Sequence, residues 1–403
     1  MLTVAEGLEK VLAHAHSLPP RTSTLAQARC LTLAEDIAAD LDSPPFDKAL
    51  VDGYAVRSAD LRGSGTSLRV IEEVPAGRVP VRAISSGEAV MIMTGAPLPA
   101  GADAVVMIER TKRNNGQVFI DELSIVPGRN VLARGREMRA SEVVLSRGSL
   151  LNAVRLGLLA AVGRTSVSVV PRPRIAIVST GDELVEPGQV PGPGQIRNSN
   201  ATVLRAMAES AGGEVETLPI APDEPAGLHA ILERGLSADV LLITGGVSAG
   251  NRDLVPDALE RLGVSRVFHK IRLKPGKPLW FGVGPARGND PGPLVFGLPG
   301  NPVSGFVGFV LFVRPSLDRL AGRTSPSSRP LEARLARTFV HAGDRPTYHP
   351  SRWVAGVGSG LEPLEWAGSA DLRTITRADG FAVFPAGDRV HEAGEFIPFL
   401  PLE

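Results

Sequence analysis

Three segments of the chain place glycines and acids directly after short apolar runs. They read "VSTGDEL", "LLITGGVSAGNRD" and "FGLPGNPVSG". Glycine lets a backbone approach a ligand closely, and the free N–H groups at the start of a following helix favour an anion. The first two segments add carboxylates at Asp182, Glu183 and Asp253, which suit Mg²⁺ when ligand phosphates complete its coordination. The three segments together predict a site for an anionic, phosphate-bearing ligand.

Each of these acids also has a simpler interpretation. Asp253 precedes "LVPDALERL" and could be only the N-cap of a helix that has Pro256 in its first turn. Asp182 could cap a helix in the same way. Because helix caps are common, capping is the more frequent role for any one such acid alone. The hypothesis of a ligand site depends on three similar turns at successive strand ends.

The lysines give a second argument for an anion site. The chain has 43 basic residues, but only six are lysines, and three of them, Lys270, Lys274 and Lys277, fall within "KIRLKPGK". Lysine carries a compact charge on a flexible stem and is not interchangeable with arginine. The cluster therefore favours phosphate or oxyanion contact over a chance grouping on a solvated strand.

The elements that must position these residues follow a βαβ pattern. Apolar runs such as "RIAIVST", "ADVLLITGG" and "PLVFGLPGNP" alternate with helix-like segments such as "NSNATVLRAMAESAGG" and "GLHAILERGL". This alternation predicts a mainly parallel sheet that is covered on both faces. Ligands bind beyond the carboxyl ends of the strands in such sheets, which is where the three glycine-rich segments fall.

The rest of the chain predicts a multidomain α/β plus β protein. "LEKVLAHAHSL" and "TLAQARCLTLAEDIAADL" show helical spacing, short alternating runs such as "SLRVIEEV" and "GQVFID" follow, and "LLNAVRLGLLAAVG" resumes the helix pattern. The predicted parts are a helical or mixed N-terminal domain (1–43 and 141–170), an inserted β domain (44–140), the α/β domain (171–322) and a C-terminal β-barrel-like domain (323–403).

Composition excludes several classes of protein. The 403 residues are 43% hydrophobic and 21% charged, with a formal net charge of zero, as is typical of a soluble globular protein and not of a nucleic-acid binder. The single cysteine, Cys30, allows no internal disulfide, and the seven histidines show no metal-binding spacing. The uncharged stretch 294–313 is interrupted at Pro299–Pro302, so no membrane span is predicted. The expected location is the cytoplasm.

Seven motifs of the chain together resemble those of one protein family. "FDKALVDGYAVR", "MIMTGAPLPAGADAVVMIE", "STGDELVEPG", "GQIRNSN", "TGGVSAGNRD", "KPGKP" and "LPGNPVSG" occur in the order and spacing of the MoeA family, the molybdopterin molybdenumtransferases, which are similar to the E domain of gephyrin. The resemblance implies an elongated four-domain protein, usually a homodimer, whose α/β part has the molybdopterin-binding fold. It implies insertion of molybdate into adenylated molybdopterin, with Mg²⁺-dependent release of AMP and of molybdenum cofactor.

The resemblance also implies site residues. The implied catalytic positions are Asp52, Thr94, Glu137, Glu183, Asp223, Asp253, Lys270 and Lys274. Of these, Glu183, Asp223 and Asp253 are the implied Mg²⁺ ligands. The implied positions for the pterin phosphate and adenylate are Thr180, Gly181, Gly245, Gly246, Ser248, Gly250, Lys277, Pro299, Gly300, Asn301, Pro302 and Ser369.

Two motifs depart from the family pattern. The family commonly has N-S-A-M before DGYA, where this chain has "KALV", beginning at Lys48. It also commonly has R-x-x-G-E-D, where this chain has Leu132, Arg136 and Glu137 in place of the Arg, Glu and Asp. Glu137 can still coordinate or accept a hydrogen bond, one methylene further out.

Partners and alternative functions follow from the same resemblance. A second copy of the chain would complete the cleft with its β domain, and a molybdopterin adenylyltransferase is a candidate partner. Two alternatives stay open: the chain could itself be such an adenylyltransferase, or a scaffold or cofactor carrier without catalysis. Residues 1–170 argue against the first, since that reaction does not need them, and the retained acids argue against the second.

Overall fold

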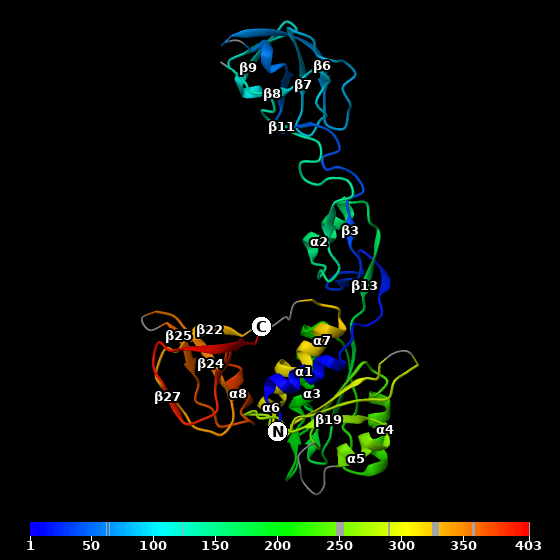
Figure 1. The fold of residues 1–403 in the computed structure, drawn as a ribbon, viewed down its shortest axis with the longest axis vertical. Helices are drawn as coiled ribbons and strands as arrows, with labels where there is room; N and C mark the ends of the chain where they lie inside the picture. The colour runs from blue at the N-terminus through cyan, green and yellow to red at the C-terminus, as the bar shows by residue number, and fades with distance from the viewer. Residues whose placement is uncertain are drawn as a thin grey trace. The chain divides into compact units, whose positions relative to one another are not determined.

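The computed structural model describes residues 1–61, 63, 65–122, 124–246, 254–288, 291–324, 330–356 and 359–402. The chain divides into two compact units (Figure 1). Unit 1 holds Met1–Ala34, Gly148–Asn152 and Val167–Glu403, and unit 2 holds Glu35–Arg147 and Ala153–Ser166. The four domain boundaries expected from the sequence stay predictions.

Unit 1 contains the predicted mainly parallel sheet. Its six strands have the order β17 (Glu214–Thr217), β14 (Arg174–Ser179), β18 (Val240–Thr244), β21 (Leu294–Leu298), β20 (Trp280–Val283) and β19 (Ser265–His269). The first four strands are parallel, and β20 and β19 are antiparallel to their neighbours. Every residue of β18 and β21 is buried, as expected for strands covered on both faces.

Two hydrophobic cores cover the two faces of this sheet. Ile175 and Ile177 face the core built with α1 (Val4–His14), α3 (Ser199–Ser210), α6 (Pro302–Gly308), the π-helix η3 (Phe309–Val313) and α7 (Arg314–Leu320). Ala176 and Val178 face the core built with α4 (Pro225–Gly235) and α5 (Leu254–Arg261). The alternation along β14 thus divides its side chains between the two layers.

The helices begin where their sequences favour a start. The side chain of Asn198 accepts a hydrogen bond from Ala201 N at the start of α3. The carboxylate of Glu224 accepts from Ala226 N and Gly227 N ahead of α4, which has Pro225 at its first position. Thr3 and Glu6 form a capping box at the start of α1.

The helix expected over "TLAQARCLTLAEDIAADL" is wrong. These residues form turns, the end of β1 (Arg21–Thr24), and the short strands β2 (Thr32–Leu33) and β3 (Ile37–Ala38). Strand β2 pairs with β13 (Ser166–Val170), and β3 pairs with β12 (Val143–Leu145). Cys30 has φ 63°, which a helix does not allow. The pairing of segments more than a hundred residues apart outweighs local helix propensity here.

The first helix is correctly expected, but it packs on the α/β layer. Val11 of α1 is fully buried in the core that also holds Phe312. A side chain at Gly7 would lie 2.7 Å from Ile271 Cδ1 and 3.2 Å from Phe312 Cε1. The glycine therefore allows α1 to lie close against this core.

Unit 2 contains the β segment expected between residues 44 and 140. Its six-stranded sheet has the order β8 (Ala104–Met107), β5 (Gly53–Val56), β7 (Glu88–Ile92), β6 (Thr66–Val74), β10 (Gln117–Ile120) and β9 (Thr111–Asn114). Strand β4 (Lys48–Ala49) pairs with β11 (Val131–Leu132). The unit also holds α2 (Ala153–Ala161) and two short 3₁₀ turns, η1 (Ser58–Asp60) and η2 (Ile108–Arg110).

The C-terminal part of unit 1 is the expected β structure, with a half-barrel sheet. Its strands have the order β22 (Leu331–Arg334), β28 (Phe396–Pro401), β26 (Gly380–Phe384), β24 (Thr347–Val354) and β25 (Gly360–Pro363). Strands β23 (Phe339–His341) and β27 (Arg389–His391) pair beside it, and α8 (Leu372–Ile375) precedes β26. Within the described residues, no helix is long and apolar enough to cross a membrane.

Three of the seven histidines are buried in this C-terminal part. The rings of His341, His349 and His391 lie around Phe384, with centroid distances of 5.8, 6.1 and 5.0 Å. Burial is the main cause that lowers the pKa of His349 from 6.5 to about 4. Its Nε2 donates a hydrogen bond to Leu364 O at 2.8 Å.

We expect this histidine to make stability depend on pH. Between pH 6.5 and about 4 the unfolded chain binds a proton at His349 that the folded chain does not, so the free energy of unfolding falls as the pH falls. The loss should reach about 3 kcal/mol and then level off. Urea unfolding at several pH values checks this, with His349→Gln as the comparison. If the variant has the wild-type slope between pH 6.5 and 4, this role of His349 is refuted.

Candidate functional site

The carboxyl ends of β14, β18 and β21 meet at one edge of the sheet. Thr180 N donates to Thr244 O at 3.0 Å, and Gly245 N donates to Leu298 O at 3.2 Å, so the three predicted turns lie side by side. They border a cleft of about 430 Å³. It is lined by Thr180, Glu183, Leu184, Ile196, Arg197, Asn198, Ser199, Asn200, Thr244, Gly245, Gly246, Pro278, Pro299, Gly300, Asn301 and Pro302.

The glycines at the end of β18 are required by close packing around Thr180. Gly245 and Gly246 have φ values of 92° and 62°, which favour glycine. A side chain at Gly245 would lie 2.6 Å from Thr180 O, and one at Gly246 would lie 2.8 Å from Thr180 Oγ1. Thr180 Oγ1 is itself buried without a hydrogen-bond partner among the described residues. Leaving such a group unsatisfied costs about 1–3 kcal/mol, which a bound ligand could recover.

Asn200 ties two of the strand ends together. Its Nδ2 donates to Thr244 Oγ1 at 2.9 Å and to Gly300 O at 2.7 Å. The motif "GQIRNSN" contains this residue, which was not among the predicted site residues. The only feature of the sequence that could have indicated Asn200 is an amide side chain at the start of α3. That it bridges the second and third turns is visible only in the fold.

Of the two acids of the first turn, Glu183 lines the cleft and Asp182 is not among its lining residues. The exposed carboxylate of Glu183 lies directly over Gly181, where a side chain would collide with it. Asp182 caps no helix, because its Oδ1 accepts from Asp223 N at 3.0 Å and thus ties the turn after β14 to the loop before α4. Asp223 is exposed in that loop.

These residues fit Mg²⁺ only if a ligand supplies further oxygens. Among the described residues, no group of three or more His, Cys, Asp and Glu side chains could hold a metal ion. Mg²⁺ is usually held by one or two carboxylates together with substrate phosphates. Glu183 lines the cleft and could provide one of them, whereas Asp223 is not among the residues that line it. The third predicted ligand, Asp253, lies outside the described residues, as do Ser248 and Gly250.

The lysine segment borders the same cleft through its turn. Lys270 N donates to Leu279 O at 2.8 Å, and Ile271 N donates to Lys277 O at 3.0 Å. Pro278, which follows Lys277, lines the cleft, but none of the three lysines is among the residues that line it. Lys270 is half-buried and has φ 75°, an unusual and strained conformation for a residue with a Cβ. Such strain is often retained at functional sites.

The C-terminal part reaches the third turn. Asn301 Nδ2 donates to Ser369 Oγ at 2.9 Å, and Val303 N donates to Ser369 O at 3.0 Å. The structure thus brings the predicted Ser369 to the predicted Asn301, although 68 residues separate them.

In unit 2, two of the predicted residues contact each other. Thr94 N and Thr94 Oγ1 both donate to Asp52 Oδ1 at 2.7 Å. These two hydrogen bonds, with the backbone one as the larger cause, hold the pKa of the Asp52 carboxyl below its ordinary value. Asp52 is therefore a fixed carboxylate at neutral pH.

A second cavity in unit 1, of about 360 Å³, lies at the amino ends of the same strands. Three of its charged side chains are engaged with each other or with the backbone. Arg174 and Asp239 form an ion pair at 3.2 Å, and Arg287 donates to Ser237 O and Ala238 O at 3.0 Å. None of the predicted site residues lines it.

Comparison with known proteins identifies the family. Residues 2–163 match the MoeA N-terminal region (domains I and II), residues 176–319 a domain described as "probable molybdopterin binding domain", and residues 332–402 the MoeA C-terminal region (domain IV). A molybdopterin molybdenumtransferase of Staphylococcus aureus (strain COL) is 32% identical over 408 residues, which cover all of this chain and 96% of that protein. The chain belongs to the MoeA family.

Other MoeA relatives agree in sequence and in structure. Molybdopterin molybdenumtransferase 2 of Mycobacterium tuberculosis (strain ATCC 25618 / H37Rv) is 39% identical over 336 residues, which cover 81% of each chain. The crystal structure of the molybdopterin biosynthesis MoeA protein from Pyrococcus horikosii superposes with a TM-score of 0.84 at 32% identity, covering 100% of this chain and 99% of that one. These matches confirm the family that the motifs indicated.

The two departures from the MoeA motifs lie next to each other. Lys48 of β4 is directly opposite Leu132 of β11, and Lys48 Nζ is 4.0 Å from Glu137 Oε1. Ser43 Oγ donates to Glu137 Oε2 at 2.7 Å, and Glu137 N donates to Ser43 O at 2.8 Å. Lys48 thus places a positive charge near Glu137 from the strand opposite Leu132.

We expect the charge of Glu137 to be needed for activity. Glu137→Gln keeps the size and can still accept from Ser43, so the loss of charge should remove most of the AMP release. Glu137→Asp keeps the charge but shortens the side chain, and a shift of about 1 Å can cost on the order of 100-fold in rate, so it should be intermediate. Steady-state AMP release decides between the roles: wild-type rates for Glu137→Gln would make Glu137 a solvated loop acid.

Proposed function

We propose that this protein is a molybdopterin molybdenumtransferase. It inserts molybdate into the dithiolene of adenylated molybdopterin, and it releases AMP and molybdenum cofactor. The names of the Staphylococcus and Mycobacterium relatives support this function. The observation that carries it is the cleft in which three glycine-rich strand ends and the carboxylate of Glu183 come together with Thr180 Oγ1, which has no hydrogen-bond partner among the described residues.

The residues of the cleft bind and orient the substrate. Backbone N–H groups of the turns and the hydroxyl of Thr180 hold the pterin phosphate and adenylate. Asn200 keeps the second and third turns in register by its bonds to Thr244 Oγ1 and Gly300 O. Lys270 and Lys274 balance the charge of molybdate and of the phosphate that leaves with AMP, as preorganised positive charge does in other transferases.

The acids complete the proposal. Glu183 and Asp223, with Asp253, would hold Mg²⁺ together with the phosphates of the substrate. The ion would supply positive charge that offsets the negative charge of the phosphoanhydride. Asp52, Thr94 and Glu137 act from the β domain of a partner copy in a homodimer. We place the enzyme in the cytoplasm, where a molybdopterin adenylyltransferase would supply its substrate.

Release of AMP from purified protein and adenylated molybdopterin tests the function. We expect release that depends on Mg²⁺ and is stimulated by molybdate. Equal release without molybdate, or none at all, would refute the transferase function. Consumption of ATP with unmodified molybdopterin would indicate an adenylyltransferase, and tight binding without turnover would indicate a carrier.

A further inference from the structure

The lysine segment is joined to the C-terminal half-barrel by its backbone. Lys274 N donates to Pro346 O at 3.0 Å, and Tyr348 N donates to Lys274 O at 2.8 Å. Lys274 and Thr347 thus form a parallel β-bridge. Both backbone polar groups of Lys274 are fixed by residues on either side of Thr347, so the placement of Thr347 sets where the lysine stem begins.

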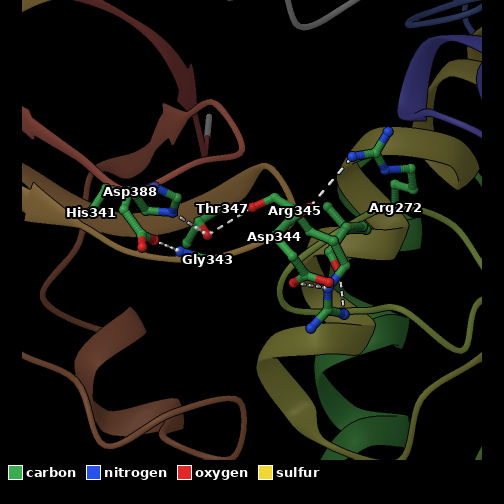
Figure 2. A network of polar contacts seen from close by, with 8 residues as sticks. Arg272, His341, Gly343, Asp344, Arg345, Thr347 and Asp388 are labelled. Carbon is green, nitrogen blue, oxygen red and sulfur yellow. Dashed lines mark hydrogen bonds and ion pairs between the residues drawn. The ribbon is translucent and has the colours of Figure 1, made fainter.

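Thr347 is in turn held by a buried histidine. Its Oγ1 is 2.8 Å from His341 Nε2, and His341 Nδ1 is 3.0 Å from Gly387 O. A carbonyl can only accept, so Nδ1 carries the ring proton, and in the neutral ring Nε2 accepts from the Thr347 hydroxyl. Both side chains are less than 5% exposed. Figure 2 shows His341 beside Thr347, with Asp344 and Arg345 lying between them and Arg272 in this view.

The surrounding contacts hold the same loop on both sides. Gly343 N donates to Asp388 Oδ1 at 3.1 Å. Arg345 Nη1 donates to Leu273 O at 3.2 Å, next to Lys274 in the chain, and Arg272 Nη2 donates to Asp344 O at 3.4 Å (Figure 2). Arg272 is exposed and Arg345 is half-buried, whereas Thr347 and His341 are buried.

We propose that Thr347 and His341 are positioning residues for Lys274. The buried hydrogen bond between Thr347 and His341 fixes the backbone at the start of β24. The two backbone hydrogen bonds between this strand and Lys274 then fix the position of the Lys274 backbone. The inference rests on the proposed function, because it assumes that the ammonium group of Lys274 binds molybdate or the phosphate of the substrate. A lysine side chain is flexible, so its ammonium can be preorganised only if its backbone is fixed, and a displacement of about 1 Å can cost on the order of 100-fold in rate.

Matched variants of strand β24 test the proposal. Thr347→Val keeps the shape and removes the hydroxyl, and Thr347→Ser keeps the hydroxyl. Ser351→Ala is the control, because it removes another fully buried hydroxyl of the same strand, which donates to His349 O at 3.0 Å and has no contact with the lysine segment. His341→Phe removes the acceptor from the other side and can keep the ring stack on Phe384.

The first measurement is hydrogen exchange at the amides of Lys274 and Tyr348 in the protein without substrate. We expect exchange roughly 3- to 10-fold faster in Thr347→Val and in His341→Phe, as the loss of one hydrogen bond predicts, and wild-type exchange in Thr347→Ser and Ser351→Ala. The double variant should exchange no faster than His341→Phe alone, because Thr347→Val removes a hydrogen bond that His341→Phe already lacks. Unchanged exchange in Thr347→Val, or equal acceleration in Ser351→Ala, would overturn the proposal.

The second measurement is calorimetric binding of molybdate alone, followed by the kinetics of AMP release. We expect Thr347→Val to weaken molybdate binding roughly 3- to 10-fold and to lower kcat more than it raises the KM for adenylated molybdopterin, with Thr347→Ser restoring both. Faster exchange with unchanged molybdate binding would overturn the role for Lys274. Absence of AMP release from the wild type would instead refute the proposed function. Hydrogen exchange and molybdate binding would still test whether Thr347 and His341 position Lys274.

Discussion

Lys270→Gly should reduce AMP release by 100-fold or more without destabilising the protein. The activity should fall because the variant removes a preorganised charge, whose loss typically costs about 10²–10³ in kcat. The stability should be preserved because φ at Lys270 is 75°, where a residue with a Cβ is strained by roughly 1–2 kcal/mol and glycine is not. That relief offsets the greater backbone entropy that glycine loses on folding. The free energy of unfolding should therefore stay within about 1 kcal/mol of wild type.

A matched control separates the charge from the backbone. Asn115 has φ 46° in the exposed turn between β9 and β10, far along the chain from the lysine segment. Asn115→Gly should likewise leave stability unchanged or slightly higher, and it should keep full AMP release. Urea unfolding and steady-state kinetics on both variants give the answer. If Lys270→Gly is fully active, the ammonium group of Lys270 is not needed for AMP release, and the strained backbone at this position does not serve to place it.

Glu183→Gln should remove most Mg²⁺-dependent AMP release and leave the stability unchanged. The carboxylate is exposed at the rim of the cleft, so its neutral isostere disturbs no packing. An amide is a far weaker ligand for Mg²⁺ than a carboxylate, and we expect a loss on the order of 100-fold at low Mg²⁺, partly recovered as Mg²⁺ is raised. Glu186→Gln, three residues along the chain, serves as the control and should behave as wild type.

Gly181→Ala tests the same carboxylate through its surroundings. A methyl group at position 181 would occupy the place of the Glu183 carboxylate, which must then swing away. The backbone has φ 137° there, so a moderate loss of stability is expected as well, about 1–3 kcal/mol. Equal activities of wild type and Glu183→Gln at every Mg²⁺ concentration would exclude Glu183 as a metal ligand, whatever Gly181→Ala does.

Much of the α/β layer could be predicted because its signals are local. A buried parallel strand is a short apolar run, and a close turn needs glycine, so β14, β18 and β21 and the glycines after them can be read from a few neighbouring residues. The topology of such sheets then brings the carboxyl ends together. This is why the cleft holds Thr180, Gly245 and Gly300 as expected.

Residues 24–41 show where local signals mislead. Their apolar spacing favours a helix, yet β2 and β3 pair with strands more than a hundred residues further along the chain. The backbone hydrogen bonds of these short strands depend on partners that no local window contains. Helix propensity amounts to less than about 1 kcal/mol per residue for ordinary residues, so such pairing decides the outcome.

The sequence by itself determined the family, the mainly parallel sheet with glycine-rich turns at three strand ends, and the residue types at the cleft. The tertiary structure decided which side chains hold these turns together. Asn200 meets Gly300, which is 100 residues away, Ser369 meets Asn301, and the backbone of Lys274 is bridged to β24. A hydrogen bond depends on distances of a few tenths of an ångström, and for residues so far apart in the chain only the packed fold sets those distances.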